Sequence, residues 1–421
     1  MEQGTSPVYS AQPAAAALAV RTGAPAALRE ALLAARERTL RLAEDFRAAL
    51  GPQPHVPYAA ELNPPLWELG HVAWFQEWWV GRNPDRALGV GARGGAPRSA
   101  SLLPGSDALY DSGRVGHRTR WALVLPEPEE TDRYLRQTLE DTLEALDRLQ
   151  PDAGDDALYF FRLAAQHEQM HAEAAVMMAQ GLGIALRECG APAVAGAGTE
   201  LLVGADALRL GDPQPGFAFD NELGAHEVEL AAYAIDAEPV TWGAYLPFVE
   251  GGGYEDLRWW TPQGRAWLAT LRLRQPANLR RAGGGWEQFR HGTWHPLHAA
   301  QVAVHLNAHE ADAWCAWARR RLPTEAEWEH AALTQPGFRW GAAWEWTASR
   351  FQPYPGFVPH PYADYSAPWF GSRRVLRGAS TATAAAMAHP RYRNFYEPHR
   401  RDVLAGFRSA RTQDGTKPSG V

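Results

Sequence analysis

The sequence predicts an α+β protein in which a bundle of four helices precedes a second domain that mixes short strands with loops. The first half contains four segments with apolar residues at helical spacing. The second half is dense in glycine and tryptophan and offers only short strand candidates. Between the halves, residues 186–199 are poor in charge and rich in glycine and alanine, which is typical of a domain junction.

The first half is predicted to be a leader followed by the four-helix bundle. Residues 1–25 are expected to form a flexible leader, because their alanine-rich run lacks the basic start of a signal peptide. The loop over 81–120 is too long to be a mere connection. We assign residues 26–190 to the bundle. The apolar spacing predicts helices over 26–50, 63–79, 130–149 and 155–180.

Two histidines in the fourth predicted helix form a candidate metal site. His167 and His171 are four residues apart, so a helix places their imidazoles on one face. Two neutral imidazoles one turn apart can bind a single divalent metal, and Glu168 and Glu173 are close enough in sequence to accept hydrogen bonds from them. The alternative is a pair of solvated or hydrogen-bonded histidines without a metal.

The same residues spell His-Glu-x-x-His, which is also the signature of zinc proteases. A metzincin would continue with a glycine and a third histidine, but Ala174 and Met177 stand at those offsets. A third ligand must therefore come from another segment. His71 in the second predicted helix is the candidate, because facing helices of a bundle can bring side chains onto one metal.

The second half, residues 200–412, is expected to be an irregular α+β domain whose loops are packed by large aromatic rings. Only one strong helix is predicted there, over 310–319. Thr324 and Glu327 have the offset of a capping box, so we assign this charged phrase to structure rather than to catalysis. Residues 413–421 are expected to form a tail.

Composition and charge exclude several classes of function. The net charge of -7 and the scattered lysines and arginines leave no basic surface for nucleic acid. No segment is long and apolar enough for a membrane span. Cys189 and Cys315 lie far apart and form neither a disulfide framework nor a Cys-x-x-Cys metal site. These features predict a cytoplasmic protein whose partners are small molecules, not nucleic acid or a membrane.

Several phrases in the second half resemble the formylglycine-generating-enzyme-like domain. They stand in the family order at 321–332, 344–349, 374–380 and 393–395 with 405–408. The resemblance implies a C-type-lectin-like α+β fold for most of residues 200–412. It does not imply formylglycine generation, because that activity needs a copper-binding cysteine pair that Cys189 and Cys315 do not resemble.

The first half resembles a DinB-type helical bundle. The Pro-Leu-Trp-x-Leu-Gly-His run that ends at His71 and the His-Glu-x-x-His-x-Glu run at 167–173 are similar to the iron-binding motifs of the ergothioneine sulfoxide synthases, the EgtB family. This resemblance implies that His71, His167 and His171 hold a non-haem Fe(2+) and that O2 is a co-substrate. It also implies that sulfur is attached to imidazole C2 of hercynine, the trimethylated betaine of histidine. Met170 departs from the family pattern, since many of these synthases have glutamine before the last histidine.

The run at 393–408 resembles more closely the selenoneine synthases, the SenA branch, in which the donor is a selenosugar. The resemblance therefore implies a selenoneine synthase that joins selenium to hercynine through a selenoxide-type intermediate. An ergothioneine-type sulfoxide synthase with a thiol donor is the near alternative. Because zinc binds the same ligands, a zinc-dependent DinB-type thiol transferase or hydrolase is an alternative of another class. A ligand-binding protein without a metal is the third.

The resemblance also suggests which residues hold the substrates. Asn394 and Phe395 match family positions around hercynine, whose quaternary ammonium requires aromatic faces rather than hydrogen-bond donors. Arg118 and Arg120 are candidates for holding a polyhydroxyl or anionic donor. The alternatives are that Phe395 is an ordinary core ring and that both arginines are solvated loop residues.

A proton donor is required near the activated oxygen, and a phenol can supply the proton. Tyr110 is expected in this role, because it lies where some relatives place a catalytic tyrosine. Tyr396 is the second candidate. For both residues, the alternative is a purely structural tyrosine.

Overall fold

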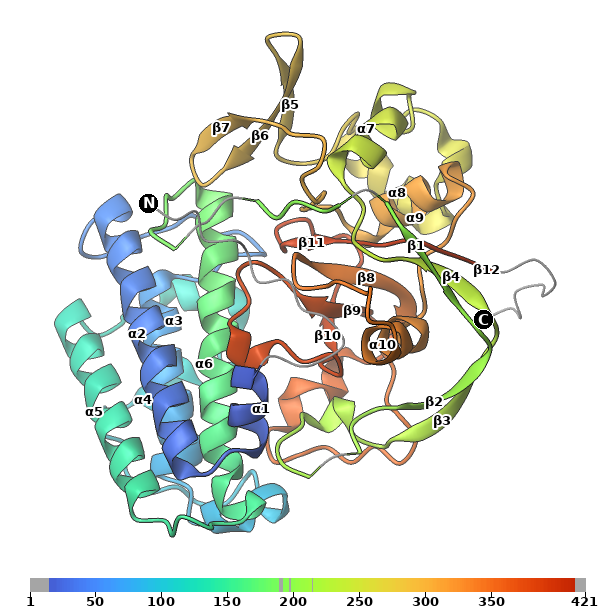
Figure 1. Ribbon diagram of the computed structural model, residues 1–421. Coiled ribbons are helices and arrows are strands. Elements are labelled where there is room, and N and C mark those ends of the chain that lie inside the picture. Colours follow the sequence, from blue (N-terminus) through green and yellow to red (C-terminus); the bar gives the residue numbers. More distant parts are fainter. Residues whose placement is uncertain (1–14, 189–191, 197, 214, 413–421) are drawn as a thin grey trace.

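The computed structural model describes residues 15–412, except 189–191, 197 and 214. Figure 1 shows a helical bundle on one side and a domain of short strands and helices on the other, with the long helix α6 (Asp155–Leu182) between them. The protein is therefore α+β, as the sequence predicts.

The bundle contains the four long helices that the apolar spacing predicts. Three of them begin at a proline, which is tolerated in a first turn because the N–H there has no partner within the helix. Gly183, with φ of 70°, ends α6 in a left-handed conformation that favours glycine. Leu32, Leu135 and Phe160 are fully buried at the centre. Besides α6, the bundle has α2 (Pro25–Leu50), α3 (Pro65–Gln76), the short α4 (Ser106–Tyr110) and α5 (Pro128–Asp147).

The predicted leader is in part a helix, which corrects the expectation of a flexible segment up to residue 25. Residues Ala15–Thr22 form α1, and Arg21 is buried. Its guanidinium donates to Glu222 at 2.7 Å and pairs with Asp212 at 3.3 Å, so α1 is held against the second domain. Local spacing does not reveal this helix, because its main partner is 201 residues away in sequence. Residues 1–14 of the predicted leader lie outside the described residues.

We expect Arg21→Ala to lower the free energy of unfolding by about 3–5 kcal/mol, because it leaves the buried Glu222 without its partner. Chemical denaturation followed by tryptophan fluorescence measures this change. Arg29→Ala, which removes an exposed pair with Asp147, is the control and should cost at most about 1 kcal/mol. Equal effects of the two substitutions would contradict a docking role for α1.

The second domain contains four α-helices among its described residues, where one strong helix and a second helix start, at the capping box of Thr324, were predicted. The predicted one is α9, and its neighbour α10 begins with the expected capping box, in which Glu327 N donates to Thr324 Oγ1 at 3.1 Å. The helix α7 escaped prediction because it contains Pro247, which is unusual inside a helix. The helices are α7 (Trp242–Glu250), α8 (Pro262–Leu271), α9 (Ala308–Trp317) and α10 (Glu325–Thr334).

The strands of the second domain form small sheets, and the largest one faces α6. Its order is β10-β9-β8-β11, and only the β8–β11 pair is parallel. The predicted tail at 413–421 lies outside the described residues. The strands are β1 (Glu200–Val203), β2 (Asp206–Leu210), β3 (His226–Leu230), β4 (Tyr233–Asp236), β5 (Leu279–Ala282), β6 (Gly285–Arg290), β7 (Thr293–Pro296), β8 (Ala343–Arg350), β9 (Arg374–Ala379), β10 (Asn394–Tyr396), β11 (Ala405–Gly406) and β12 (Ala410–Thr412).

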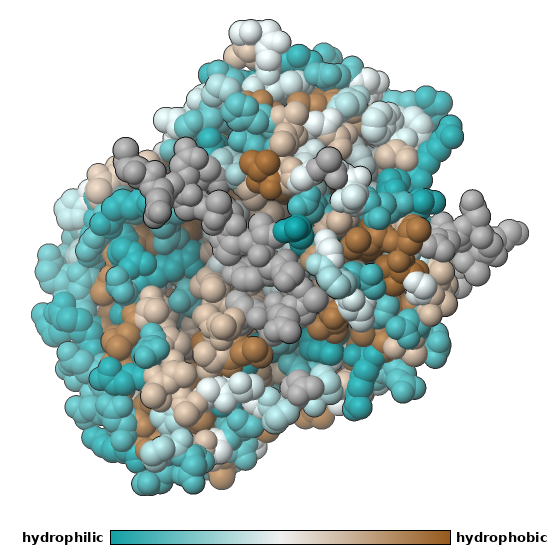
Figure 2. Space-filling model, viewed as in Figure 1, coloured by the Kyte–Doolittle hydropathy of each residue, from teal (hydrophilic) through white to brown (hydrophobic). Residues whose placement is uncertain are grey.

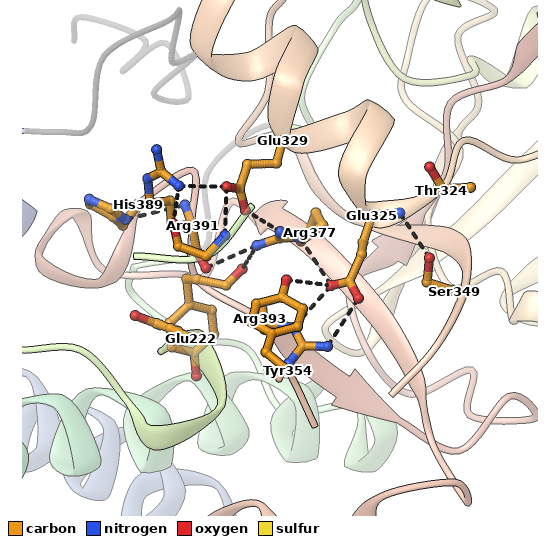
Figure 3. A network of polar contacts seen from close by, with 12 residues as sticks. Glu222, Thr324, Glu325, Glu329, Ser349, Tyr354, Arg377, His389, Arg391 and Arg393 are labelled. Carbon is orange, nitrogen blue, oxygen red and sulfur yellow. Dashed lines mark hydrogen bonds and ion pairs between the residues drawn. The ribbon is translucent and has the colours of Figure 1, made fainter. Parts of the chain in front are cut away.

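A buried network of charges fixes the chain that leads into β10 (Figure 3). Arg393 donates to Glu325 at 2.9 Å, and Arg391 donates to Glu329 at 2.7 Å. Arg377 pairs with Glu329, and both of these side chains are fully buried. Because buried charges are costly unless they are paired, this network holds the start of β10 in one position relative to α10.

Glu173 joins α6 to the second domain. Its Oε1 accepts hydrogen bonds from Trp344 at 2.7 Å, Ser380 at 2.7 Å and Thr383 at 2.8 Å. Burial raises the pKa of this carboxyl, and the hydrogen bonds act in the opposite direction. The loop after β9 is therefore seated on α6 next to His171.

The outer surface of the bundle that Figure 2 presents is mainly hydrophilic. Within the described residues, every helix is too short or too polar to cross a membrane.

Candidate metal centre

Three histidine rings converge inside the bundle, close to the second domain. His71 comes from α3, whereas His167 and His171 come from α6, and one ring nitrogen of each lies within 4.8 Å of the other two. The ring centroid of His71 is 5.1 Å from that of His167 and 4.8 Å from that of His171. The two Nε2 atoms on α6 are 3.2 Å apart. The one-turn spacing on α6 thus turns both rings toward α3.

Hydrogen bonds fix the tautomers of two of these rings. His71 Nδ1 lies 2.8 Å from the backbone carbonyl oxygen of Tyr110, and His171 Nδ1 bonds to the carboxylate of Glu68. A carbonyl and a carboxylate can only accept, so Nδ1 is the donor in both pairs. Nε2 of each ring therefore keeps a free lone pair directed at the centre, which is the arrangement that metal-binding histidines adopt.

The environment keeps two of the rings, those of His71 and His167, neutral. Burial lowers the pKa of His71 to about 3 and holds the pKa of His167 well below its usual value. Burial acts to raise the pKa of Glu68, but the neighbouring His171 lowers it to about 2, so the acceptor is ionised. Neutral imidazoles are the form that binds a metal. The three nitrogens fit a divalent transition metal, although this ligand set alone does not choose between iron and zinc.

Aromatic rings surround the three histidines. Phe75 stacks on His167 with 3.5 Å between ring centroids, and Trp67 stacks on His71 at 4.9 Å. Tyr362, in the loop between β8 and β9, is 6.2 Å from His167 and 5.0 Å from Phe75. The second domain thus places a phenol beside the metal centre.

The two glutamates predicted to accept hydrogen bonds from the histidines do not contact them. Glu168 accepts from Arg36 at 2.7 Å, and Glu173 bonds to the second domain. The physical reason is helical geometry, since each residue turns the side chain by about 100° from the one before it. Glu68 supplies the carboxylate that bonds to His171 instead. Its position about one turn before His71 could have indicated a residue near the metal site.

We expect Glu68→Gln to weaken metal binding by about 10–100-fold, the usual effect of losing the acceptor that orients a ligand. Calorimetric titration of the metal-free protein with Zn²⁺, and with Fe²⁺ under nitrogen, measures the affinity. Glu30→Gln, at an exposed position of α2, is the control. A Glu68→Gln protein with unchanged affinity would show that this carboxylate does not orient His171.

The side chains of the two predicted proton donors contact groups other than the histidine rings. Tyr110 is fully buried, and the end of its ring packs so closely on Gly70 that any side chain there would collide with it. Only its backbone carbonyl contacts His71. Tyr396 lies near Glu173, with Arg400 over its ring at 5.3 Å. The geometry therefore gives Tyr110 an orienting role through its backbone, which differs from the expected role of its phenol.

Two rings, those of Tyr365 and Tyr362, lie between Phe395 and His167. Phe395 stacks on Phe351 at 4.0 Å and meets Tyr365 edge-on at 5.8 Å. Tyr365 is in turn 6.0 Å from Tyr362. The Asn394 side chain accepts from the backbone N–H of Phe395 at 2.9 Å. These two residues thus pack behind the rings of Tyr365 and Tyr362 and do not contact the metal ligands.

The two candidate arginines are placed differently. Arg120 lies over the ring of Trp67 at 3.9 Å. Its charge acts to lower the pKa of Tyr362, which burial raises. Arg118 is exposed and lies over the ring of Tyr58 at 5.1 Å. Arg120 is therefore part of the centre's surroundings, whereas Arg118 belongs to the outer surface.

A cleft of about 670 Å³ opens beside Tyr362. Its walls carry the indole of Trp78 and the carboxylates of Asp111 and Asp364. Arg114 also lines the cleft and forms an ion pair with Asp111 at 3.1 Å. The cleft thus offers aromatic faces and acceptors for a substrate next to the metal centre.

Two family models match the chain. Residues 31–175 match the DinB superfamily, and residues 197–342 and 339–413 match the sulfatase-modifying factor enzyme 1-like domain. The predicted fold class, a DinB-like bundle followed by a formylglycine-generating-enzyme-like domain, is confirmed.

Known proteins resemble the chain along nearly its whole length. It is 33% identical to the hercynine oxygenase of Mycolicibacterium smegmatis, over 91% of this chain and 98% of that protein. It is 32% identical to the hercynine oxygenase of Mycolicibacterium thermoresistibile, over 91% and 94%. The formylglycine-generating enzyme of Streptomyces coelicolor is 26% identical over only 48% of this chain and 86% of that protein. Because the likeness to hercynine oxygenases spans both halves, the chain belongs to the EgtB/SenA-type family, the family of the hercynine oxygenases.

Proposed function

We propose that the protein is a non-haem iron(II), oxygen-dependent synthase that joins a selenosugar to imidazole C2 of hercynine. The observation that carries the proposal is the convergence of ring nitrogens of His71, His167 and His171 in a chain similar to hercynine oxygenases. Three protein ligands leave coordination positions open for substrates. Bound iron(II) supplies the activation of dioxygen.

The proposed reaction balances with dioxygen as the only oxidant. The C2–H bond of hercynine and the Se–H bond of the donor are broken, and a C–Se bond forms. One atom of O2 stays on selenium as a selenoxide. The other leaves as water with the two hydrogens.

Tyr362 is the proposed proton donor. Burial raises its pKa, so the phenol keeps its proton at neutral pH and can give it to an oxygen atom that gains charge. Its ring is the second-domain ring nearest His167 among the described residues. No periodic pattern marks its loop, whereas Tyr110 is the residue that the family resemblance suggests.

Hercynine is proposed to lie between α6 and the tyrosines of the second domain. Tyr365 and Tyr392 are joined through their hydroxyls at 3.0 Å, and the Tyr392 hydroxyl lies 3.5 Å from the sulfur of Met170. Aromatic faces of this kind suit a quaternary ammonium, which cannot accept or donate a hydrogen bond. Met170 stands where many relatives have glutamine, and its side chain contacts Tyr392 in this group of rings.

The charge of the cleft favours a donor without carboxylates over an amino-acid thiol. Arg114 is already paired with Asp111, and Asp364 forms no ion pair with any described residue. A thiol amino acid or peptide brings carboxylates, which the surplus negative charge repels. A sugar can instead stack on Trp78 and donate hydroxyl hydrogens to the carboxylates. This contrast supports the selenosugar over the ergothioneine-type thiol donor.

A competition assay tests the proposal. Iron-loaded protein, prepared under nitrogen, is given hercynine, oxygen, a selenosugar and either cysteine or γ-glutamylcysteine, and the products are identified by mass spectrometry. We expect the selenium product to dominate. Dominant sulfur products would indicate the ergothioneine-type function. A zinc protein without iron-dependent oxygen uptake would indicate the thiol transferase or hydrolase.

We expect Asp364→Asn to shift donor preference toward the anionic thiol by about tenfold in kcat/KM, which corresponds to about 1.4 kcal/mol. The competition assay measures this ratio. Asp152→Asn, at an exposed position between α5 and α6, is the control. An unchanged ratio in Asp364→Asn would contradict a role for the charge of the cleft in donor selection.

A further inference from the structure

An apolar pocket adjoins the metal centre at the end of α3 opposite the cleft. It lies between α2, α3 and α6, has a volume of about 40 Å³, and reaches His171. On α3, the residues that line the pocket lie between Pro65 and Val72, whereas the cleft is lined by Trp74 and Phe75. The two spaces share no lining residue, so the metal centre has two separate approaches.

The walls of this pocket do not suit water or either organic substrate. Leu42, Val72 and Met178 are buried apolar parts of its lining. Glu68 and His171 also line it, but they are hydrogen-bonded to each other.

Two further polar residues line the pocket: Arg47, which pairs with Asp132, and Thr39, whose buried hydroxyl oxygen has no hydrogen-bond partner within the described part of the chain. A buried water needs about 10–15 Å³ and two to four polar partners, and Thr39 offers one, so the mainly apolar lining favours an apolar occupant. A small apolar molecule suits both the volume and the lining.

Dioxygen is the apolar reactant of the proposed reaction. Hercynine carries charges and a sugar carries hydroxyls, so both need polar surroundings. These are found in the cleft and between α6 and the second domain near Tyr362. Once they occupy that side, oxygen requires another path to the metal. We propose that the pocket beside His171 binds dioxygen and supplies it to the metal centre from the bundle side. This inference rests on the proposed function.

Xenon, which occupies apolar cavities, tests the pocket without any turnover. Crystals of the metal-loaded protein are pressurised with xenon, and anomalous scattering locates the bound atoms. We expect a site between Leu42, Leu69 and Met178, and we expect Ala175→Phe, which fills the pocket from α6, to remove it. Xenon that is absent from this pocket in the wild-type protein would overturn the inference.

Kinetics at varied oxygen concentration test the supply path. We expect Ala175→Phe to raise the KM for oxygen by about tenfold, within the roughly hundredfold that a two-atom ligand can lose. The KM for hercynine and the metal content should stay unchanged. The control is Leu123→Phe, which narrows a different pocket of about 160 Å³ near Arg120. A rise in the KM for oxygen in Leu123→Phe but not in Ala175→Phe would overturn the inference.

Different results would contradict the proposed function and the assignment of the pocket. A wild-type protein that consumes no oxygen with hercynine and either donor would end the proposed function, whatever the variants do. Normal turnover with an unchanged KM for oxygen in Ala175→Phe would end only the pocket's assignment. If the Ala175→Phe protein does not fold, Ala43→Leu fills the same pocket from α2 and replaces it in both measurements.

Discussion

His71→Ala is expected to abolish both metal binding and activity. The substitution removes one of three nitrogen ligands, and the two that remain on α6 leave the metal with too few protein donors. The loss should exceed the roughly 100-fold that follows removal of an outer hydrogen-bond partner. Metal content per chain after anaerobic loading and kcat with saturating substrates measure it.

His117→Ala is the matched control for this ligand. His117 is also a half-buried histidine of the first half, but its ring bonds to the backbone carbonyl of Leu62 at 2.7 Å and not to the other histidines. We expect this variant to retain one metal per chain. A His71→Ala protein with full metal content and activity would remove His71 from the ligand set.

Tyr362→Phe is expected to keep the metal but to lower kcat by about 10²–10⁴-fold, the usual contribution of a positioned proton donor. The ring stays, so the contacts with Phe75 and His167 should persist and only the proton is lost. Single-turnover product formation in H2O and D2O separates this effect from substrate binding. Tyr110→Phe should lower kcat far less, because its hydroxyl faces Gly70. The reverse order of effects would restore Tyr110 as the donor.

The helices of the bundle and its histidine pair could be predicted because their signals are local. Apolar spacing sets the helices, and the four-residue offset sets the common face of His167 and His171. His71 required one more step, the expectation that facing helices share a metal, and the structure brings its ring to the pair. The fold of the second domain followed from family phrases rather than from periodicity.

The residues that escaped prediction depend on distant parts of the chain. Tyr362 lies in an irregular loop, and its place beside His167 results from how the second domain is seated on α6 through Glu173. The helix that contains Arg21 is held by carboxylates of the second domain. The spacing between Glu68 and His71 could have indicated the role of Glu68. Glu168 and Glu173 were chosen because they lie closer in sequence to His167 and His171. Contacts between segments far apart, which a single sequence does not reveal, decide all of these positions.

The most direct test is a crystal structure of the iron-loaded protein with hercynine, with diffraction data on both sides of the iron absorption edge. The account predicts one iron atom bound by the Nε2 atoms of His71, His167 and His171, with hercynine between it and Tyr362. An iron atom bound elsewhere, or three rings that do not share it, would contradict the account.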